Sequence, residues 1–185
     1  VSGKLLTNYL KEALGNQTDL DLRKDFYTVN LLKEETCFVS KCFKQDMKNK
    51  NKEKKVFLLP DYRKKKEEDL IKLPKDRYSV TVDALRFIIP EILFNPNLIG
   101  IAEGGIHDGI TQCIDSCHDD FKNLLYENIV LTGGNFNFSN FTERLSFELI
   151  PNSDYDSNIK IWNMMSNSYS DSVIKGMKFL SQTPE

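Results

Sequence analysis

A short apolar run that ends at a pair of glycines constrains the fold of this chain more than any other feature. Residues 129–131 are apolar and β-branched at two positions, and Gly133 and Gly134 follow them. Such side chains are typical of a buried strand, and a glycine pair lets the backbone approach a neighbour closely because no Cβ intervenes. Apolar residues then recur at helical spacing over residues 141–149. The pattern predicts a strand, a turn and a helix of an α/β fold, in which ligands bind at the carboxyl ends of strands.

The start of this helix and the role of the glycine pair each have two interpretations. Either Ser139 or Asn140 can cap the helix, with Glu143 supplying the second half of a capping box. The glycine pair can contact a nucleotide, or it can simply permit a tight turn between strand and helix. Both interpretations of the pair agree with the residues.

The composition is that of an ordinary folded protein. Of 185 residues, 40% are apolar and 28% are charged, with a net charge of −2, which is enough apolar material to build a core. No apolar run reaches the length of a membrane span, and no signal-peptide pattern opens the chain, so we expect no membrane association. The chain begins at Val1, not Met, and helical periodicity follows almost at once. We interpret it as a piece of a longer protein.

The cysteines predict reduced thiols in an intracellular compartment. Cys113 and Cys117, with His107 and His118 nearby, allow either part of a zinc site or thiols on a helix. The other two cysteines lie far away in the sequence and lack C-x-x-C spacing, so thiols on a helix are the favoured interpretation. We therefore predict no metal site.

Hydrophobic periodicity predicts alternating helices and short strands. Helices are expected at 4–14 (ending at Gly15), 22–32 (capped by Asp19 or Asp21), 90–94 (opened by Pro90), 105–126 (in two parts), 141–149 and 173–181. Extended segments are expected at 37–39, 56–59, 70–71, 78–82, 129–131 and 159–162.

Residues 43–77 differ in composition from the rest of the chain. They carry 13 Lys or Arg and 7 Asp or Glu, so this stretch is basic and the remainder is acidic. A nucleic-acid surface and a solvated insertion are both possible interpretations. The lysines are interleaved with Asn and Glu, and no aromatic stacking pattern accompanies them, which favours the insertion.

Several runs, in matching order, resemble actin and the actin-related proteins, and together they cover nearly the whole chain. They are Gly3-Lys4-x-Leu6-Thr7-Asn8-Tyr9-Leu10, Lys33-Glu34-x-x-Cys37-Phe38-Val39, Pro90-Glu91-x-Leu93-Phe94-x-Pro96-x-x-Ile99-Gly100, Gly105-Ile106-His107 and Leu125-Tyr126-x-Asn128-Ile129-Val130-Leu131-Thr132-Gly133-Gly134. Within the family, residues 1–12, 59–62 and 132–137 are most similar to the nuclear actin-related proteins of class six.

The resemblance implies part of the actin-like (ribonuclease-H-like) ATPase fold, namely the second half of a two-lobed α/β structure. Residues 5–86 are expected to form a small inserted α+β lobe with a basic insertion at 43–77. Residues 87–185, together with 1–4, are expected to form part of the larger lobe. Its sheet would be incomplete here and its edge exposed, so we expect the chain alone to be marginally soluble and to lack a sharp cooperative melt.

In the family the two lobes close around ATP or ADP with Mg, which we expect in the full-length protein and not tightly held by this chain. The implied nucleotide-contacting residues are Lys33, Glu34, Gly133, Gly134, Asn135 and Phe138. Asn135 and Phe138 stand where actin has threonine and tyrosine. Without the resemblance, Lys33 and Glu34 would be interpreted as a solvated helix end.

Three departures from the family pattern weaken the expectation of tight nucleotide binding. Asn30 stands in place of a family arginine, Tyr169 falls near the position of a family lysine, and residues 173–176 retain only part of a Trp-x-Gly-Gly run. The family's phosphate loops, metal-holding aspartate and water-orienting glutamine do not fall within these residues. Because phosphoryl transfer depends on positioned phosphates and Mg²⁺, we predict no catalytic residues here.

The implied function is a non-catalytic scaffold subunit of a nuclear chromatin-remodelling complex that exchanges a core histone for its variant. Its partners would be other subunits of that complex, with the basic stretch as a candidate contact for histones or nucleosomal DNA, and its location nuclear and also cytoplasmic. The alternatives are an ATP-binding cytoskeletal actin-like protein and an ATPase or phosphotransferase of the same superfamily. A filament-forming actin would have an uninterrupted smaller lobe, whereas residues 63–69 are all charged.

Overall fold

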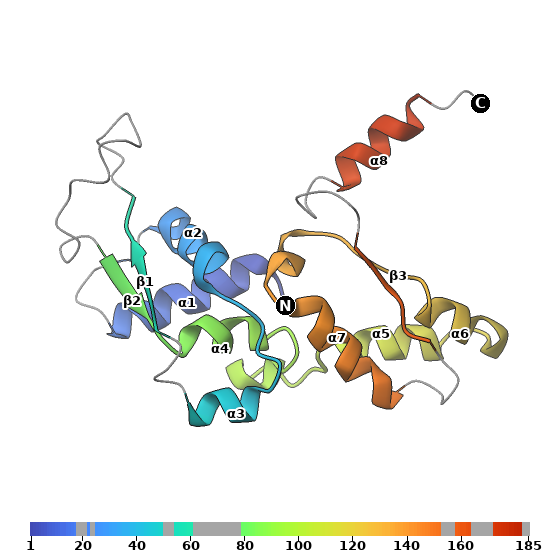
Figure 1. The fold of residues 1–185 in the computed structure, drawn as a ribbon, viewed down its shortest axis with the longest axis horizontal. Coiled ribbons are helices and arrows are strands. Elements are labelled where there is room, and N and C mark those ends of the chain that lie inside the picture. Colours follow the sequence, from blue (N-terminus) through green and yellow to red (C-terminus); the bar gives the residue numbers. More distant parts are fainter. Residues whose placement is uncertain are drawn as a thin grey trace. The chain divides into compact units, whose positions relative to one another are not determined.

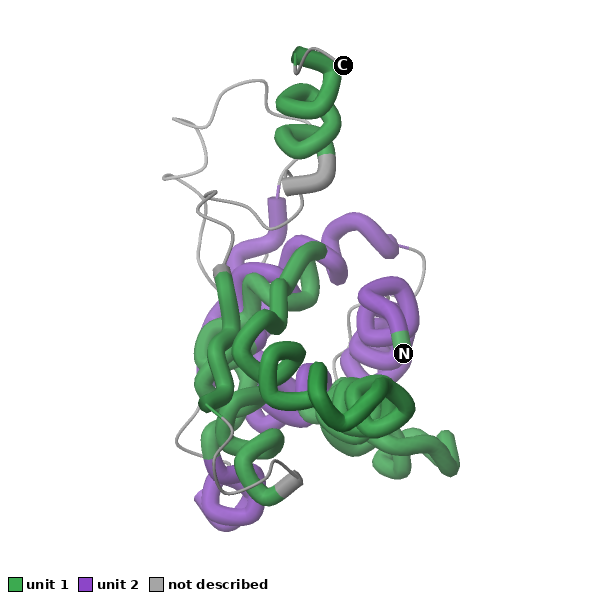
Figure 2. Tube along the Cα trace, turned by 90° about the vertical axis from the view of Figure 1, so that its right-hand side faces the viewer, with its two compact units in different colours: residues 1, 38–41, 91–185 green, residues 2–37, 42–90 purple. Residues whose placement is uncertain are grey.

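Two sheets, each two-stranded among the described residues, organise the chain (Figure 1). The computed structural model describes residues 1–17, 22, 25–49, 54–60, 79–152, 158–163 and 172–182. The chain divides into two units (Figure 2): unit 2 comprises Ser2–Cys37 and Cys42–Pro90, and unit 1 comprises Val1, Phe38–Lys41 and Glu91–Glu185. These units come from the contacts within the structure, and the lobe boundaries implied by the resemblance stay a prediction.

Unit 2 combines helices with an antiparallel strand pair. Its elements are α1 (Gly3–Gln17), α2 (Phe26–Thr36), α3 (Phe43–Lys48), β1 (Lys55–Leu58), β2 (Ser79–Val82) and most of α4 (Leu85–Glu91). β1 pairs with β2 from Lys55↔Val82 to Leu58↔Ser79. α1 packs against α2, and α2 also contacts β1.

Helix α1 buries a stripe of leucines spaced four residues apart. Leu6, Leu10 and Leu14 are fully buried, because residues at this spacing lie on one face of a helix. The periodicity of this helix also predicts Tyr9 on the buried face together with Leu6 and Leu10; the two leucines are buried as predicted, whereas Tyr9 is 36% exposed. Gly15 does not end α1, which continues to Gln17.

Helix α2 begins at a cap that the sequence patterns did not identify. The Asp25 carboxylate accepts a hydrogen bond from the Thr28 backbone N–H at 3.0 Å, so Asp25 is the N-cap. The predicted caps, Asp19 and Asp21, lie outside the described residues. Asp25 also accepts from the Thr28 hydroxyl at 2.6 Å, which strengthens this helix start.

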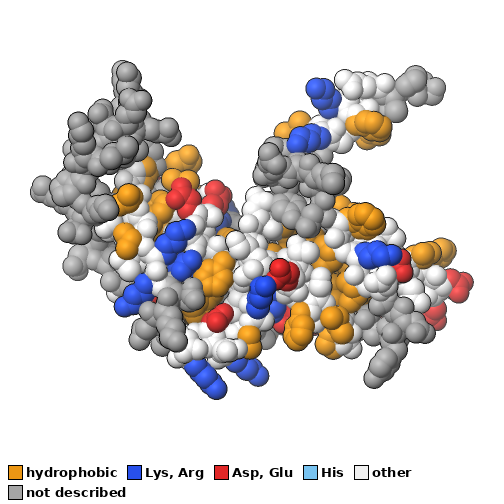
Figure 3. Space-filling model, viewed as in Figure 1, with side chains coloured by type: hydrophobic (Ala, Val, Ile, Leu, Met, Phe, Trp, Pro, Cys, Tyr) orange, Lys and Arg blue, Asp and Glu red, His pale blue; other side chains and the backbone are white. Residues whose placement is uncertain are grey.

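The described part of the stretch 43–77 contains one helix and one strand. β1 lies within it, as predicted, and α3 is an additional helix absent from the predicted elements. Lys44 and Lys48 of α3 are exposed, and basic side chains project from this helix in Figure 3. The predicted segment 70–71 lies outside the described residues.

Helix α4 begins before Pro90 and not at it. The helix spans Leu85–Glu91 and holds Pro90 in its last turn, so the expected start at Pro90 is wrong. Proline has no backbone N–H, so a helix that contains it lacks one intrahelical hydrogen bond. That loss falls near the end of the helix, and the full burial of Phe87 and Ile89 favours the helical conformation.

Unit 1 contains the predicted strand–turn–helix. Its elements are the 3₁₀ helices η4 (Pro96–Ile99), η5 (Gly134–Asn137) and η6 (Ile150–Asn152), the helices α5 (Ile106–Asp115), α6 (Asp119–Tyr126), α7 (Phe141–Leu149) and α8 (Ser172–Leu180), and the strands β3 (Ile129–Leu131) and β4 (Ile161–Asn163). β3 and β4 pair in parallel, with Val130 opposite Trp162. α5 packs against α6 and α7.

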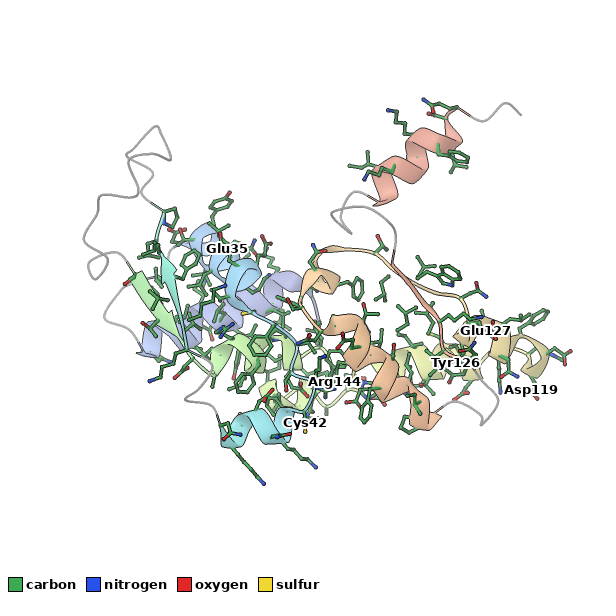
Figure 4. All side chains as sticks on the ribbon, in the orientation of Figure 1. Glu35, Cys42, Asp119, Tyr126, Glu127 and Arg144 are labelled. Atoms are coloured by element: carbon green, nitrogen blue, oxygen red, sulfur yellow. The ribbon has the colours of Figure 1, made fainter. Side chains whose placement is uncertain are left out.

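These elements confirm the predicted break between α5 and α6 and the predicted segments around β3, β4 and α8. Tyr126 and Glu127 lie where α6 ends and β3 approaches (Figure 4). The Lys160 backbone N–H donates to the Tyr126 carbonyl at 3.0 Å, and the Trp162 indole donates to the Glu127 carbonyl at 3.0 Å. These bonds fix the register of β4 against the end of α6.

Helix α8 exposes its apolar side chains in this chain. Its exposed apolar residues are Ile174, Met177, Phe179 and Leu180. No helix in the described part of the chain is both long enough and apolar enough to cross a membrane.

Candidate functional site

The residues predicted to contact nucleotide fall in both units. Lys33 and Glu34 lie on α2 in unit 2. Gly133, Asn135 and Phe138 lie in and beside η5, after β3, in unit 1, and Gly134 begins η5.

The Lys33 ammonium is buried and held by the protein itself. Only 4% of the residue is exposed. Its Nζ donates to the Gly3 carbonyl at 3.2 Å, to the Thr7 hydroxyl at 2.9 Å and to the Asn30 side-chain oxygen at 3.0 Å. The alternative of a solvated helix end is therefore wrong for Lys33.

Asn30 connects both predicted nucleotide-contacting residues of α2. Its Oδ1 accepts from Lys33, and its Nδ2 donates to the Glu34 carboxylate at 2.8 Å. The Thr7 hydroxyl lies 3.0 Å from the same Asn30 oxygen. Glu34 itself is exposed. α1 and α2 are thus joined by a polar cluster of Thr7, Asn30, Lys33 and Glu34.

Burial also changes the acid–base behaviour of Lys33. Desolvation lowers the pKa of its ammonium, while the nearby Glu34 and Cys37 oppose that change. A lysine ammonium has three N–H donors, and all three have protein acceptors here. A ribose or base would have to displace one of them, so Lys33 as placed does not fit a nucleotide contact.

The glycine loop of unit 1 offers a bare stretch of backbone. Gly133 has φ of +109°, a conformation that other residues rarely adopt. No atom lies within 4 Å of the position that a Cβ on Gly134 would occupy. The loop therefore has room for the close backbone approach that the family resemblance implies.

The other two predicted residues of this loop differ in accessibility. Asn135 is half-buried, and Phe138 is only 7% exposed. The Phe138 carbonyl accepts from the Phe141 backbone N–H at 3.2 Å, which joins the loop to α7. A hollow of about 320 Å³ lies beside the loop, lined by Phe136, Asn137, Phe138, Asn140, Phe141, Thr142 and Glu143.

The start of α7 does not use the predicted capping box. Asn140 occupies the N-cap position in the left-handed region, with φ of 67° and no side-chain cap bond. Its Nδ2 donates instead to the Val39 carbonyl at 3.2 Å. Glu143 forms an exposed ion pair with Lys41. Both side chains bind the segment Phe38–Lys41 in place of the helix terminus.

The segment Phe38–Lys41 is attached to the start of α7 along its whole length. Phe38 forms a parallel bridge with Ser139, and the Val39 N–H donates to the Ser139 carbonyl at 3.0 Å. The prediction of an extended segment here is confirmed, although it forms a bridge and not a strand. These bonds hold the residues that follow the glycine loop.

Arg144 completes this attachment from inside the unit. It projects from α7 (Figure 4) and is 9% exposed. Its Nη1 donates to the Ser40 carbonyl at 2.7 Å, its two terminal nitrogens each lie 3.0 Å from a Glu91 carboxylate oxygen, and its Nε donates to Glu148 at 2.6 Å. Its guanidinium carbon also lies 5.0 Å from the centre of the Phe94 ring.

Sequence reasoning missed this arginine, although one signal was present. Arg144 precedes Leu145 and stands three residues after Phe141, so helical spacing places it on the apolar face of α7. A charge on an apolar face requires a partner. Desolvation raises the pKa of the partner Glu91 carboxyl, and the Arg144 hydrogen bond opposes this.

His107 lies among aromatic rings in unit 1. Its ring stacks on Phe94 with centroids 6.3 Å apart, and Phe94 contacts Phe141, which in turn contacts Phe136. No group of three or more His, Cys, Asp or Glu among the residues with described positions could hold a metal ion. Cys113 and Cys117 are exposed free thiols.

A strand that ends in a glycine loop and leads into a helix, within a mixed helix-and-sheet unit, is typical of an α/β protein. The chain belongs to the actin family, whose sequence pattern matches residues 1–176. The predicted family and the predicted partial actin-like fold are confirmed.

The similar curated proteins point to one class of the family. The chain is 32% identical over 162 residues to actin-related protein 6 of Drosophila melanogaster, covering 80% of this chain and 40% of that protein. It is 32% identical over 157 residues to the actin-like protein ARP6 of Saccharomyces cerevisiae, covering 80% and 36%. It is 30% identical over 182 residues to actin-related protein 6 of Arabidopsis thaliana, covering 82% and 43%. The chain spans about two fifths of the length of these relatives.

Proposed function

We propose that this chain is part of a non-catalytic, actin-related scaffold subunit of a nuclear complex that exchanges a core histone for its variant. The similarity to proteins named actin-related protein 6 supports the class. The observation that carries the non-catalytic role is the buried Lys33 ammonium, whose donors are all used within unit 2. This arrangement favours a residue that holds helices together over one that serves a reacting nucleotide.

ATP or ADP with Mg remains the proposed ligand of the full-length protein, since the actin family binds nucleotide in general. In this chain, Gly133 and Gly134 would border the nucleotide with bare backbone. Asn135, Phe138 and Glu34 are the further proposed contacts, of which Glu34 is exposed. In this proposal the nucleotide stabilises the closed fold and is not turned over.

The proposed partners are other subunits of the complex, with the basic stretch 43–77 as a contact for histones or nucleosomal DNA. Its exposed lysines include Lys44 and Lys48 on α3 and Lys54 before β1. Replacing Lys44 and Lys48 by Glu should weaken nucleosome binding by the assembled complex and reduce its salt dependence. The matched control replaces two exposed lysines elsewhere, Lys4 and Lys175.

The first test is affinity purification of the full-length protein from nuclear extract, followed by mass spectrometry of the co-eluting proteins. We expect a remodelling ATPase together with subunits that handle a histone variant. Recovery of cytoskeletal actin-binding proteins alone would contradict the nuclear assignment. A parallel ATPase assay on the purified full-length protein should show no turnover above background, and clear turnover would favour the phosphotransferase alternative.

A further inference from the structure

The polar cluster between α1 and α2 has a chemical consequence that does not depend on the chromatin assignment. We propose that Thr7, Asn30, Lys33 and Glu34 form a helix-to-helix lock that takes up every donor of the Lys33 ammonium. Lys33 then has no free N–H donor for a nucleotide, and Asn30 is the residue that decides this. Such a lock limits the chain's own ligand binding, which goes beyond a scaffold role.

Every N–H donor of the Lys33 ammonium has an acceptor within the protein. An ammonium has three N–H donors, and the acceptors are the Gly3 carbonyl, the Thr7 hydroxyl and the Asn30 carbonyl oxygen. Thr7 and Gly3 belong to α1, whereas Asn30 and Lys33 belong to α2. Every bond that holds the ammonium therefore also contributes to holding the two helices together or to ordering α2.

Asn30 is suited to this position because its amide both accepts and donates. Its oxygen faces Lys33 and its nitrogen faces Glu34. The opposite orientation would place an NH₂ group against the ammonium, so the network determines the orientation. An arginine at position 30 has no acceptor and carries a positive charge, so it would remove one acceptor from Lys33 and repel it. A residue of that kind would release the lysine, whereas asparagine retains it.

The hydrogen bonds of the lock stabilise the buried ammonium only when all three N–H donors have an acceptor. The ammonium is buried with neutral acceptors, and no carboxylate is among its hydrogen-bond partners. A buried donor that loses its partner costs its desolvation free energy, and more when it is charged. A nucleotide that displaced the Gly3 or Thr7 acceptor would break one hydrogen bond between α1 and α2 in exchange for one new hydrogen bond. The lysine thus stays with the protein.

The test that needs no variant is competitive acylation of the full-length protein with acetic anhydride, read by mass spectrometry. We expect Lys33 to react at least about tenfold more slowly than Lys4, which is exposed at the start of the same helix pair. A Lys33 as reactive as Lys4 would overturn the proposal.

Variants test the role of Asn30 directly. Asn30→Arg should lower the melting temperature without nucleotide and raise the affinity for ATP by about tenfold, the value of one hydrogen bond to a charged group. Asn8→Arg, on a half-buried position of α1, is the matched control and should do neither. Lys33→Met should leave ATP affinity within about twofold in the natural sequence and abolish the gain in the Asn30→Arg background.

The outcomes separate this proposal from the proposed function. A tenfold loss of ATP affinity in Lys33→Met alone would show that the lysine already reaches the nucleotide, and would overturn the lock. No gain in a folded Asn30→Arg protein would also overturn it. Recovery or loss of the chromatin complex in purification bears on the scaffold role and leaves these measurements unaffected.

Discussion

Replacing Arg144 by Met should destabilise the full-length protein far more than breaking an exposed ion pair of the same unit. Methionine keeps much of the side-chain length but removes the guanidinium. The Glu91 carboxylate, which Arg144 contacts through both terminal nitrogens at 3.0 Å, would remain buried without its partner. The Ser40 carbonyl would lose its donor as well.

The expected magnitude follows from burial. The two side chains are 9% and 4% exposed, and removing one member of such a pair costs about 3–5 kcal/mol because the other charge is left uncompensated. The control is Lys41→Met, which breaks the ion pair with Glu143. Those side chains are 61% and 63% exposed, so solvent screening limits the loss to about 0–1 kcal/mol.

The assay is the free energy of unfolding from urea titration at pH 7, with the transition of the actin-like fold followed by circular dichroism. The double variant Glu91→Met with Arg144→Met should recover most of the loss, since neither charge then remains buried. Burial already raises the pKa of the Glu91 carboxyl, and without Arg144 the pKa should rise further. Because the pKa of Glu91 is higher in the folded state than in the unfolded state, the free energy of unfolding falls as pH rises from the unfolded-state pKa through the folded-state pKa. The deficit of Arg144→Met should therefore narrow as the pH is lowered from 7 towards 5.

A loss in Arg144→Met no larger than that of Lys41→Met would refute this reasoning. It would mean that water or a moved side chain compensates Glu91 in the variant. Failure of the double variant to recover stability would instead assign the loss to the hydrogen bonds with Ser40 and Glu148, and not to the buried carboxylate.

Three further predictions concern backbone positions and a thiol. Gly105→Ala should lower the free energy of unfolding, measured by thermal unfolding, by more than about 2 kcal/mol, because a Cβ there collides with the Phe94 carbonyl. Gly109→Ala, at a position of α5 with open space around the Cβ, should raise the free energy of unfolding by about 0.5–1 kcal/mol. Burial raises the pKa of the Cys37 thiol from 9.0 to about 12. The free energy of unfolding should therefore fall as pH rises above 9, by at most about 1.4 kcal/mol per pH unit. Cys37→Ala should reduce this pH dependence of the free energy of unfolding. Asn140→Val should cost about 1–2 kcal/mol because Asn140 has φ of 67°, whereas Asn140→Gly should lose only the bond to Val39; equal losses would contradict the strain argument.

Much of the element order was predictable from local pattern. The helical periodicity of α1, the break between α5 and α6, and the strand–glycine–helix order around Gly133 all depend on residues a few positions apart. Pattern failed where two local rules competed. Pro90 is a favoured first helical residue, but burial of the apolar residues before it placed it in the last turn of α4.

The candidate site was predictable only in part. Lys33 and Glu34 were identified as a pair through family resemblance, yet one is buried and the other exposed. The position of Lys33 within the sequence of α2 does not predict that Thr7 and Gly3, on another helix, supply acceptors for its ammonium. The Asn30–Lys33–Glu34 spacing does place these three side chains on one helix face, and that signal was available.

The sequence by itself determined the family, most of the order of helices and strands (α3 and the start of α4 are the exceptions), and the position of the bare backbone at Gly133 and Gly134. These properties depend on neighbours within one or two turns. Only the tertiary structure decided how each charged group is satisfied. Arg144 and Ser40 are 104 residues apart, and Asn140 and Val39 are 101 apart. Whether a charge is solvated, paired or locked depends on desolvation and on partners that distant parts of the chain bring to it, and neither is encoded in local spacing.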